Sequence, residues 1–251
     1  SWVARNLVYY PIQALRGQRV NLFLKDLAER DTLSIKEIDQ IRDDGIIRII
    51  TAAYRNTEYY KSLFDSRGID PKDIKGYDGL IVLPVLSKRD VLNNRQGMIN
   101  PHISQNIYTR KTSGSTGITL SFCKDTQALA MNDAIMWRCY RWYGIEVGDR
   151  QARFWGVPVS FFPLMKERIK DLVLNRIRIS AFDISPSSCR SQYERLIKFR
   201  PAYIYGYTTA IYGFCLNAQT LGLDLGNLHL KAVICTAEKM YSHHRELLED
   251  A

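Results

Sequence analysis

The residues with the clearest chemical potential form a run of six small residues between two extended segments: Thr112, Ser113, Gly114, Ser115, Thr116 and Gly117. Glycine lets the backbone come close to a ligand, and successive amide N–H groups form a concavity that suits an anion such as phosphate. Arg110 and Lys111 directly precede the run and add positive charge. The run therefore indicates a phosphate site, and the alternative is a hairpin turn without a ligand.

Two better-known loops do not match this run. The P-loop of nucleotide triphosphatases has two glycines separated by four residues, then Lys and Ser or Thr, and it opens a helix. Here Gly117 is followed by Ile118 and Thr119 and then by residues typical of a strand. The nucleophile elbow of hydrolases has the pattern G-x-S-x-G, whereas Ser115 directly follows Gly114. Neither chemistry is indicated.

The elements around the run predict an α/β fold. In residues 35–64, apolar side chains recur at three- and four-residue spacing, which is typical of an amphipathic helix. Asp31 and Ser34 are candidate N-caps for that helix. We predict a helical region over residues 1–100 that packs on the core. A β-hairpin around the small-residue run and a helix over residues 126–143 follow.

Short β-type runs then alternate with helical stretches. The runs lie near residues 151–155, 178–181, 202–205 and 232–235. A spacing of strand and helix of this kind builds a mostly parallel sheet flanked by helices. We therefore predict that residues 101–251 form an α/β nucleotide-binding subdomain.

Ligands of open parallel sheets bind beyond the carboxyl ends of the strands. Residues at or just beyond the predicted strand ends therefore share one rim of the sheet and are the candidate ligand pocket: Trp155, Gly156, Gly206, Tyr207, Thr236, Ala237 and Glu238. The alternative for Glu238 is that it only caps the next helix. No residue is assigned a catalytic role, and no metal site is predicted.

Five segments in order resemble one family. Besides the TSGSTG run, they are YRNTEYY at residues 54–60, LPVLSKRD at 83–90, PAYIYGY at 201–207, and AVICTAE at 232–238 with Arg245 beyond it. They resemble the adenylate-forming superfamily, within it the phenylacetate–CoA ligase-like proteins, and most closely their CapK-like relatives in capsular polysaccharide biosynthesis. Ser87 and Asp90 in the second segment also fit a capping box that opens a helix without any ligand.

The resemblance implies a function. Residues 112–117 would hold the β- and γ-phosphates of ATP, and Tyr207 and Thr208 would begin the acyl pocket. The protein would activate a small-molecule carboxylate with ATP to an acyl-adenylate, with Mg²⁺ as cofactor and CoA as one further acceptor. A polysaccharide pathway is the implied setting.

The chain also departs from the family pattern. Ile118 and Thr119 replace the Lys and Pro that often follow the loop. The family's Tyr-Gly-x-x-Glu segment, ribose-binding Asp, hinge Arg and small-domain Lys have no counterpart before Ala251. We therefore expect a partial large domain, and an inactive or weak catalyst from these 251 residues alone. The alternatives are a non-catalytic nucleotide- or acyl-binding module and a structural protein with a relic loop.

The net charge and the cysteine content limit the classes of binding partner and the cellular compartment that we expect. The 35 Lys and Arg against 26 Asp and Glu give a net charge of +9, which fits nucleic acid, an anionic membrane surface or anionic small molecules. The basic residues are scattered, so we expect no nucleic-acid partner, while a peripheral membrane contact through the basic, aromatic N-terminal stretch stays open. Five scattered cysteines predict reduced thiols in a cytoplasmic protein.

Overall fold

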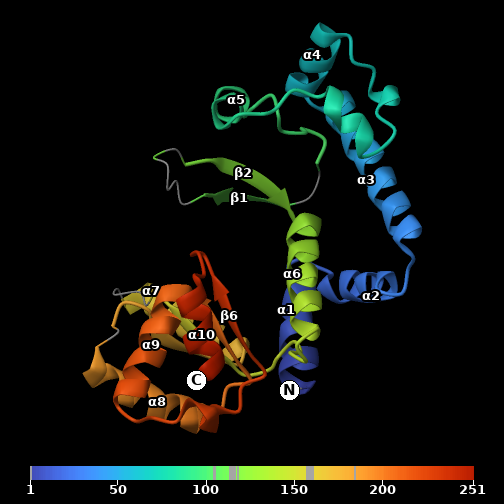
Figure 1. Cartoon of the computed structure of the whole chain (residues 1–251). Helices are drawn as coiled ribbons and strands as arrows, with labels where there is room; N and C mark the ends of the chain where they lie inside the picture. The colour runs from blue at the N-terminus through green and yellow to red at the C-terminus, as the bar shows by residue number, and fades with distance from the viewer. Residues whose placement is uncertain (1, 104–105, 113–116, 118, 157–160, 184) are drawn as a thin grey trace. The chain divides into compact units, whose positions relative to one another are not determined.

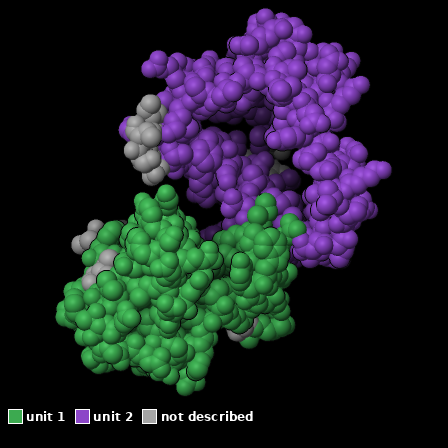
Figure 2. Space-filling view, viewed as in Figure 1, with its two compact units in different colours: residues 1–15, 135–251 green, residues 16–134 purple. Residues whose placement is uncertain are grey.

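The computed structural model describes residues 2–103, 106–112, 117, 119–156, 161–183 and 185–251 (Figure 1). The chain forms two compact units, residues 1–15 with 135–251 and residues 16–134 (Figure 2). The division into residues 1–100 and 101–251 made from the sequence stays a prediction. Among the described residues, no helix combines the length and the apolar character needed to cross a bilayer.

Helices make up most of residues 16–100. They are α2 (Val20–Arg30), α3 (Ile35–Asn56), α4 (Glu58–Arg67) and α5 (Lys88–Asn94), with the short 3-10 turns η2 (Pro71–Asp73) and η3 (Asp78–Val82). Ser34, one of the two predicted caps, begins α3: its hydroxyl accepts a bond from the amide of Glu37, and the Glu37 carboxylate accepts one from the Ser34 amide.

The single helix predicted over residues 35–64 is wrong in one respect. Thr57 is extended, with φ −132° and ψ 135°, and it separates α3 from α4. Its hydroxyl accepts a bond from the Tyr60 amide and so caps α4. A threonine can replace the lost backbone partner in this way, and the apolar periodicity on both sides hides the break. The capping box predicted at Ser87 and Asp90 is confirmed.

The predicted hairpin is present. Strand β1 (Ile107–Lys111) pairs antiparallel with β2 (Ser121–Asp125). The Thr112 amide donates to the Leu120 carbonyl over 2.9 Å, and the Leu120 amide donates to the Thr112 hydroxyl over 3.0 Å. Helix α6 (Thr126–Arg141) follows directly. The hairpin therefore holds both ends of the small-residue run close together.

The second unit contains the predicted parallel sheet. Its strands are β3 (Gln151–Trp155), β4 (Arg176–Ser180), β5 (Tyr203–Tyr207) and β6 (Ala232–Thr236), in the order β4-β3-β5-β6. All three pairings are parallel. Each strand but the last leads into a helix and then into the next strand, which is the connection that parallel strands require.

Helices flank this sheet: α7 (Phe161–Val173), α8 (Pro186–Phe199), α9 (Thr208–Thr220) and α10 (Ser242–Asp250), with η4 (Leu225–Leu228) before β6. The π-helical segment η1 (Ala4–Tyr9) and α1 (Tyr10–Leu15) belong to the same unit. Alternate strand residues point to opposite faces. Phe154 and Ile204 lie in one buried cluster with Leu196 of α8 and Phe214 of α9. The core therefore occupies one face of the sheet.

Gly206 lies directly beside Phe154 of the neighbouring strand, with no room for a side chain between them. A Cβ at this position would lie 2.5 Å from the Phe154 carbonyl oxygen and 2.6 Å from the Phe154 Cβ. Gly206 and Phe154 are register partners in the β3–β5 pairing. Packing alone therefore requires glycine at this predicted pocket position.

We expect Gly206→Ala to lower the free energy of unfolding by about 2 to 3 kcal/mol, because the added methyl overlaps backbone atoms that cannot move aside. Urea denaturation followed by tryptophan fluorescence measures this, since Trp2, Trp137, Trp142 and Trp155 all lie in the same unit.

The matched control is Gly156→Ala at the end of the neighbouring strand. Among the described residues, its Cβ would meet only the exposed Phe182 ring, at 3.4 Å. We expect a change within about 0.5 kcal/mol. Equal stability of the two variants would contradict the close approach of β3 and β5.

Candidate functional site

The predicted pocket residues lie together at the carboxyl edge of the parallel sheet. Strands β3, β5 and β6 end at Trp155, Tyr207 and Thr236. The remaining predicted pocket residues lie in these strands or directly follow them: Gly206, Thr208, Ala237 and Glu238. Their roles as ligand contacts stay predictions.

Aromatic stacking joins two of these strand ends. The rings of Trp155 and Tyr207 are stacked, with centroids 4.2 Å apart and planes 13° from parallel. The Trp155 ring is also stacked on Tyr205, at 5.9 Å and 25°. All three side chains are half-buried. By the alternation along a strand, they belong to the face opposite the buried Phe154 and Ile204. The two strands thus share a stack of aromatic rings, the aromatic surface of this sheet, that leads up to the edge.

Arg153 lies against the same aromatic surface and is not among the residues predicted from the sequence. Its Cζ is 4.5 Å from the centroid of Trp155 and 5.1 Å from that of Tyr205. Its buried Nε has no hydrogen-bond partner within the described part of the chain. Burial, and then the nearby Arg176, lower the pKa of the Arg153 guanidinium. A cation held over aromatic faces with one unused donor is suited to meet an anion. The sequence does contain a signal for Arg153: it precedes Trp155 by two residues in a predicted strand, and such residues lie on the same face of a sheet.

Glu238 caps a helix, but not the expected one. Its Oε2 accepts bonds from the amide and the hydroxyl of Thr209, each over 2.8 Å. Thr209 lies in the first turn of α9, the helix after β5, rather than in α10. A carboxylate at this place also complements the positive end of the helix. The hydroxyl of the fully buried Thr208 donates to the Glu238 carbonyl over 3.4 Å.

The turn after β6 has an unusual backbone. Ala237 has a φ of +66°, which non-glycine residues rarely adopt. Burial, followed by the nearby Glu238 charge, raises the pKa of the Cys235 thiol just before this turn. Backbone conformations of this kind cost about 1 to 3 kcal/mol and cluster at functional sites. Here the turn leads from the end of β6 to the residue that caps α9.

The predicted phosphate-binding residues are described only in part. Ser113, Gly114, Ser115 and Thr116 lie outside the described residues. The amide and hydroxyl of Thr112 close the hairpin. Gly117 has a φ of +81°, and a Cβ there would meet no atom of the described residues within 4 Å. Its glycine is therefore required by backbone conformation and not by crowding.

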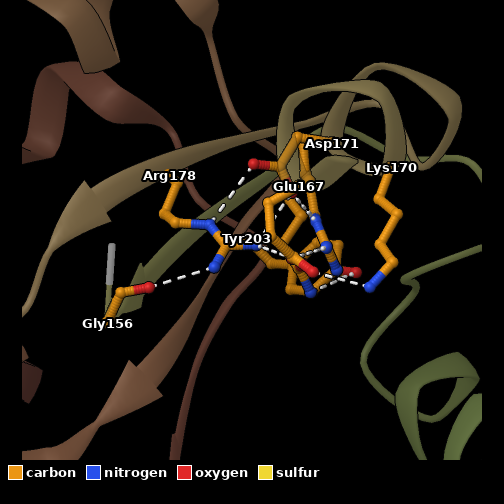
Figure 3. A network of polar contacts seen from close by, with 8 residues as sticks. Gly156, Glu167, Lys170, Asp171, Arg178 and Tyr203 are labelled. Atoms are coloured by element: carbon orange, nitrogen blue, oxygen red, sulfur yellow. Dashed lines mark hydrogen bonds and ion pairs between the residues drawn. The ribbon is translucent and has the colours of Figure 1, made fainter. Parts of the chain in front are cut away.

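A polar network fixes helix α7 to strand β4 near the carboxyl edge (Figure 3). Arg178 donates to Glu167 Oε2 over 2.6 Å, to Asp171 Oδ1 over 3.2 Å and to the Gly156 carbonyl over 3.0 Å. Arg176 is paired with Asp171. The side chains of Arg176 and Arg178 are only 8% and 11% exposed. The network thus ties the residue after Trp155 to a largely buried set of charges.

The described residues offer no ready-made metal cage. They include no group of three or more His, Cys, Asp and Glu side chains placed to hold an ion. Mg²⁺ in nucleotide sites usually takes one or two carboxylates and completes its shell with phosphate oxygens and water. Glu238 is the one acid among the predicted pocket residues, so it could supply a single ligand.

The sequence is similar to two curated proteins over part of their length. No protein-family model matches the chain. Over 203 residues the chain is 23% identical to Protein CapK of Staphylococcus aureus, which covers 78% of this chain and 44% of that protein. Over 90 residues it is 24% identical to the phenylacetate-coenzyme A ligase of Thermus thermophilus, which covers 36% of this chain and 20% of that enzyme.

Solved structures give the same fold. The chain superposes on 2-hydroxyisobutyryl-CoA ligase in an open conformation with 2-HIB-AMP and CoA, with a TM-score of 0.63, 16% identity, and coverage of 87% of this chain and 52% of that one. For the postadenylation state with R3-HIB-AMP, the TM-score is 0.58 at 16% identity, over 82% and 44% of the two chains. The chain is adenylate-forming ligase-like.

This ligase-like chain spans less than half the length of the curated relatives that it matches. Its hairpin, parallel sheet and flanking helices correspond to part of an adenylate-forming ligase fold. The predicted fold class and the predicted resemblance are therefore confirmed.

We expect Asp171→Asn to lower the free energy of unfolding by about 3 kcal/mol, because it leaves two largely buried guanidinium groups with one carboxylate fewer. The control is Glu249→Gln, which breaks an ion pair with Arg245 whose side chains are 69% and 63% exposed. Its effect should stay within about 1 kcal/mol. Urea denaturation measures the free energy of unfolding of both variants. A loss in Asp171→Asn no larger than that in Glu249→Gln would show that the network does not hold α7 on the sheet.

Proposed function

We propose that this ligase-like chain supplies the phosphate-binding loop and the acyl-facing sheet edge of an enzyme that activates a carboxylate with ATP. In that reaction a carboxylate oxygen bonds to the α-phosphorus of ATP, and the bond from that phosphorus to the leaving oxygen breaks. The products are an acyl-adenylate and pyrophosphate. An anion attacks a polyanion, so the site must provide positive charge and aligned dipoles.

One observation carries the proposal. Residues predicted as a pocket from three separate strands meet at the carboxyl edge of one parallel sheet, where ligands of such sheets bind. Trp155 and Tyr207 would form a flat wall for the acyl group or the adenine, with Arg153 as a cation behind that wall. The proteins with the same fold were solved with acyl-AMP, which supports ATP as the second substrate.

The loop at residues 112–117 would receive the terminal phosphates. The exposed Arg110 and Lys111 at the end of β1 would add charge beside it. Mg²⁺ would be held mainly by the phosphates, with Glu238 as the one predicted acid. A neighbour solved with CoA supports CoA as the acyl acceptor. The likeness to CapK supports a polysaccharide pathway as the setting.

A second candidate function is a module that binds nucleotide or acyl ligand without turnover. The observation that favours it concerns Glu238, whose carboxylate oxygen Oε2 accepts two bonds from Thr209 as a helix cap. A carboxylate used in this way is less available to a metal ion. Binding without exchange would distinguish this module from the ligase.

Calorimetry with ATP and Mg²⁺ tests the loop. We expect Ser115→Ala combined with Thr116→Ala to weaken ATP binding by about tenfold, because two hydroxyl hydrogen bonds to phosphate are lost. Thr109→Ala combined with Thr119→Ala removes two hydroxyls from the same hairpin outside the loop and should bind as the unchanged chain does. Equal affinity in all three proteins would place the nucleotide elsewhere.

Carboxylate-dependent exchange of labelled pyrophosphate into ATP separates the two functions. We expect acid-dependent but feeble exchange from residues 1–251, because Glu238, the one acid of the candidate pocket, is engaged by Thr209 and leaves little carboxylate free for Mg²⁺. Exchange that rises with one acid of a panel would favour the ligase. ATP binding with no exchange for any acid would favour the binding module.

A further inference from the structure

A cavity lies within the unit of residues 16–134. It has a volume of about 300 Å³ and lies between the end of α5 with the segment after it and the hairpin. Figure 1 shows α5 beside the hairpin strands. Its apolar lining includes Val91, Met98, Ile99, Ile103, Ile107 and Phe122. This volume is at the lower end of the range for small-molecule sites.

One cation, Arg95, also lines this cavity, and its Nε is buried and has no hydrogen-bond partner among the residues that the structure describes. A buried donor without an acceptor costs about 1 to 3 kcal/mol. A ligand anion that lets the guanidinium turn and use this donor would recover that free energy. Arg95 thus supplies the cationic donor of a charge-assisted hydrogen bond, and a ligand anion would supply the acceptor.

Local structure explains why Arg95 faces the cavity. The Ser87–Asp90 capping box fixes the start of α5, and Val91 and Arg95, four residues apart, lie on the same side of it. The turns after the helix, with Met98 N bonded to the Asn94 carbonyl, bring Met98 and Ile99 to the same wall. Arg89 on the same helix is exposed and does not line the cavity.

The acid in the lining already has a structural use. Asp125 ends β2, and its Oδ1 accepts a bond from the Ala128 amide over 2.7 Å at the start of α6. It thereby caps that helix. The cavity therefore combines one guanidinium, mostly apolar walls and an acid that is committed to a helix end.

We propose that this cavity binds a small monocarboxylate with an apolar body, with its carboxylate on Arg95. A guanidinium matches a carboxylate through two parallel hydrogen bonds, and the walls suit an alkyl or phenyl group. Inorganic phosphate has no apolar part and would need more donors than this lining offers. None of the residues of the sheet edge lines this cavity, so the inference does not depend on the proposed function.

Cys123 reports on occupancy because its half-buried thiol lines the cavity. Iodoacetamide modification of each cysteine can be followed by peptide mass spectrometry with butyrate, hexanoate or benzoate present. At least one acid should slow modification of Cys123 and leave Cys139, which is not in this lining, unchanged. The matching amide, which has the same shape but no charge, should need about tenfold higher concentration for the same protection.

Variants assign the effect to the guanidinium. Arg95→Gln should weaken protection by the acid about tenfold, whereas Arg89→Gln, on the same helix, should leave it unchanged. No protection of Cys123 by any of the three acids would overturn the proposal. So would equal protection by acid and amide, a comparison that needs no variant and holds even if Arg95→Gln fails to fold.

Discussion

The close contact of β3 with β5 at Gly206 is the constraint on which the sheet edge depends. Because Gly206 has no side chain, the Phe154 carbonyl and Cβ can occupy the space that a Cβ would fill. That approach sets the register in which Phe154 faces Gly206. The next residue of each strand, Trp155 and Tyr207, then falls on the opposite face, where the two rings stack. The absence of a side chain at Gly206 thus allows Phe154 to pack in the core and, one residue later, Trp155 to stack on Tyr207.

Much of this architecture was predictable from the sequence, because periodicity and capping are local signals. The four parallel strands, the hairpin and the Ser87 capping box were all predicted from such signals. The break at Thr57 was not, since apolar spacing continues across it, whereas the break shows only in the extended backbone of Thr57 and in the bond that the Tyr60 amide donates to its hydroxyl. Neither Arg153 nor Arg95 was singled out, because the lack of a partner for a buried Nε is a property of tertiary packing.

Several residues that the family resemblance associates with ligands also have structural duties. Thr112 closes the hairpin, Glu238 caps α9, and Gly206 is demanded by strand packing. Because these residues are needed for packing and capping, their presence supports the fold. Their presence alone does not show that they bind a ligand. The fold follows from contacts that the described residues already make, whereas the reaction depends on contacts with substrates.

The two outer strands of the sheet differ in character. Strand β4 carries Arg176 and Arg178, and the Arg195 side chain donates to the Arg178 carbonyl. Strand β6 reads Ala-Val-Ile-Cys-Thr, without a charge or a proline, and among the described residues it has a strand neighbour only in β5. Charges and covering groups discourage an extended peptide from adding to a sheet, and their lack invites it. Of the two outer strands that the structure describes, β6 is therefore the one whose residues offer less protection against the addition of a further strand.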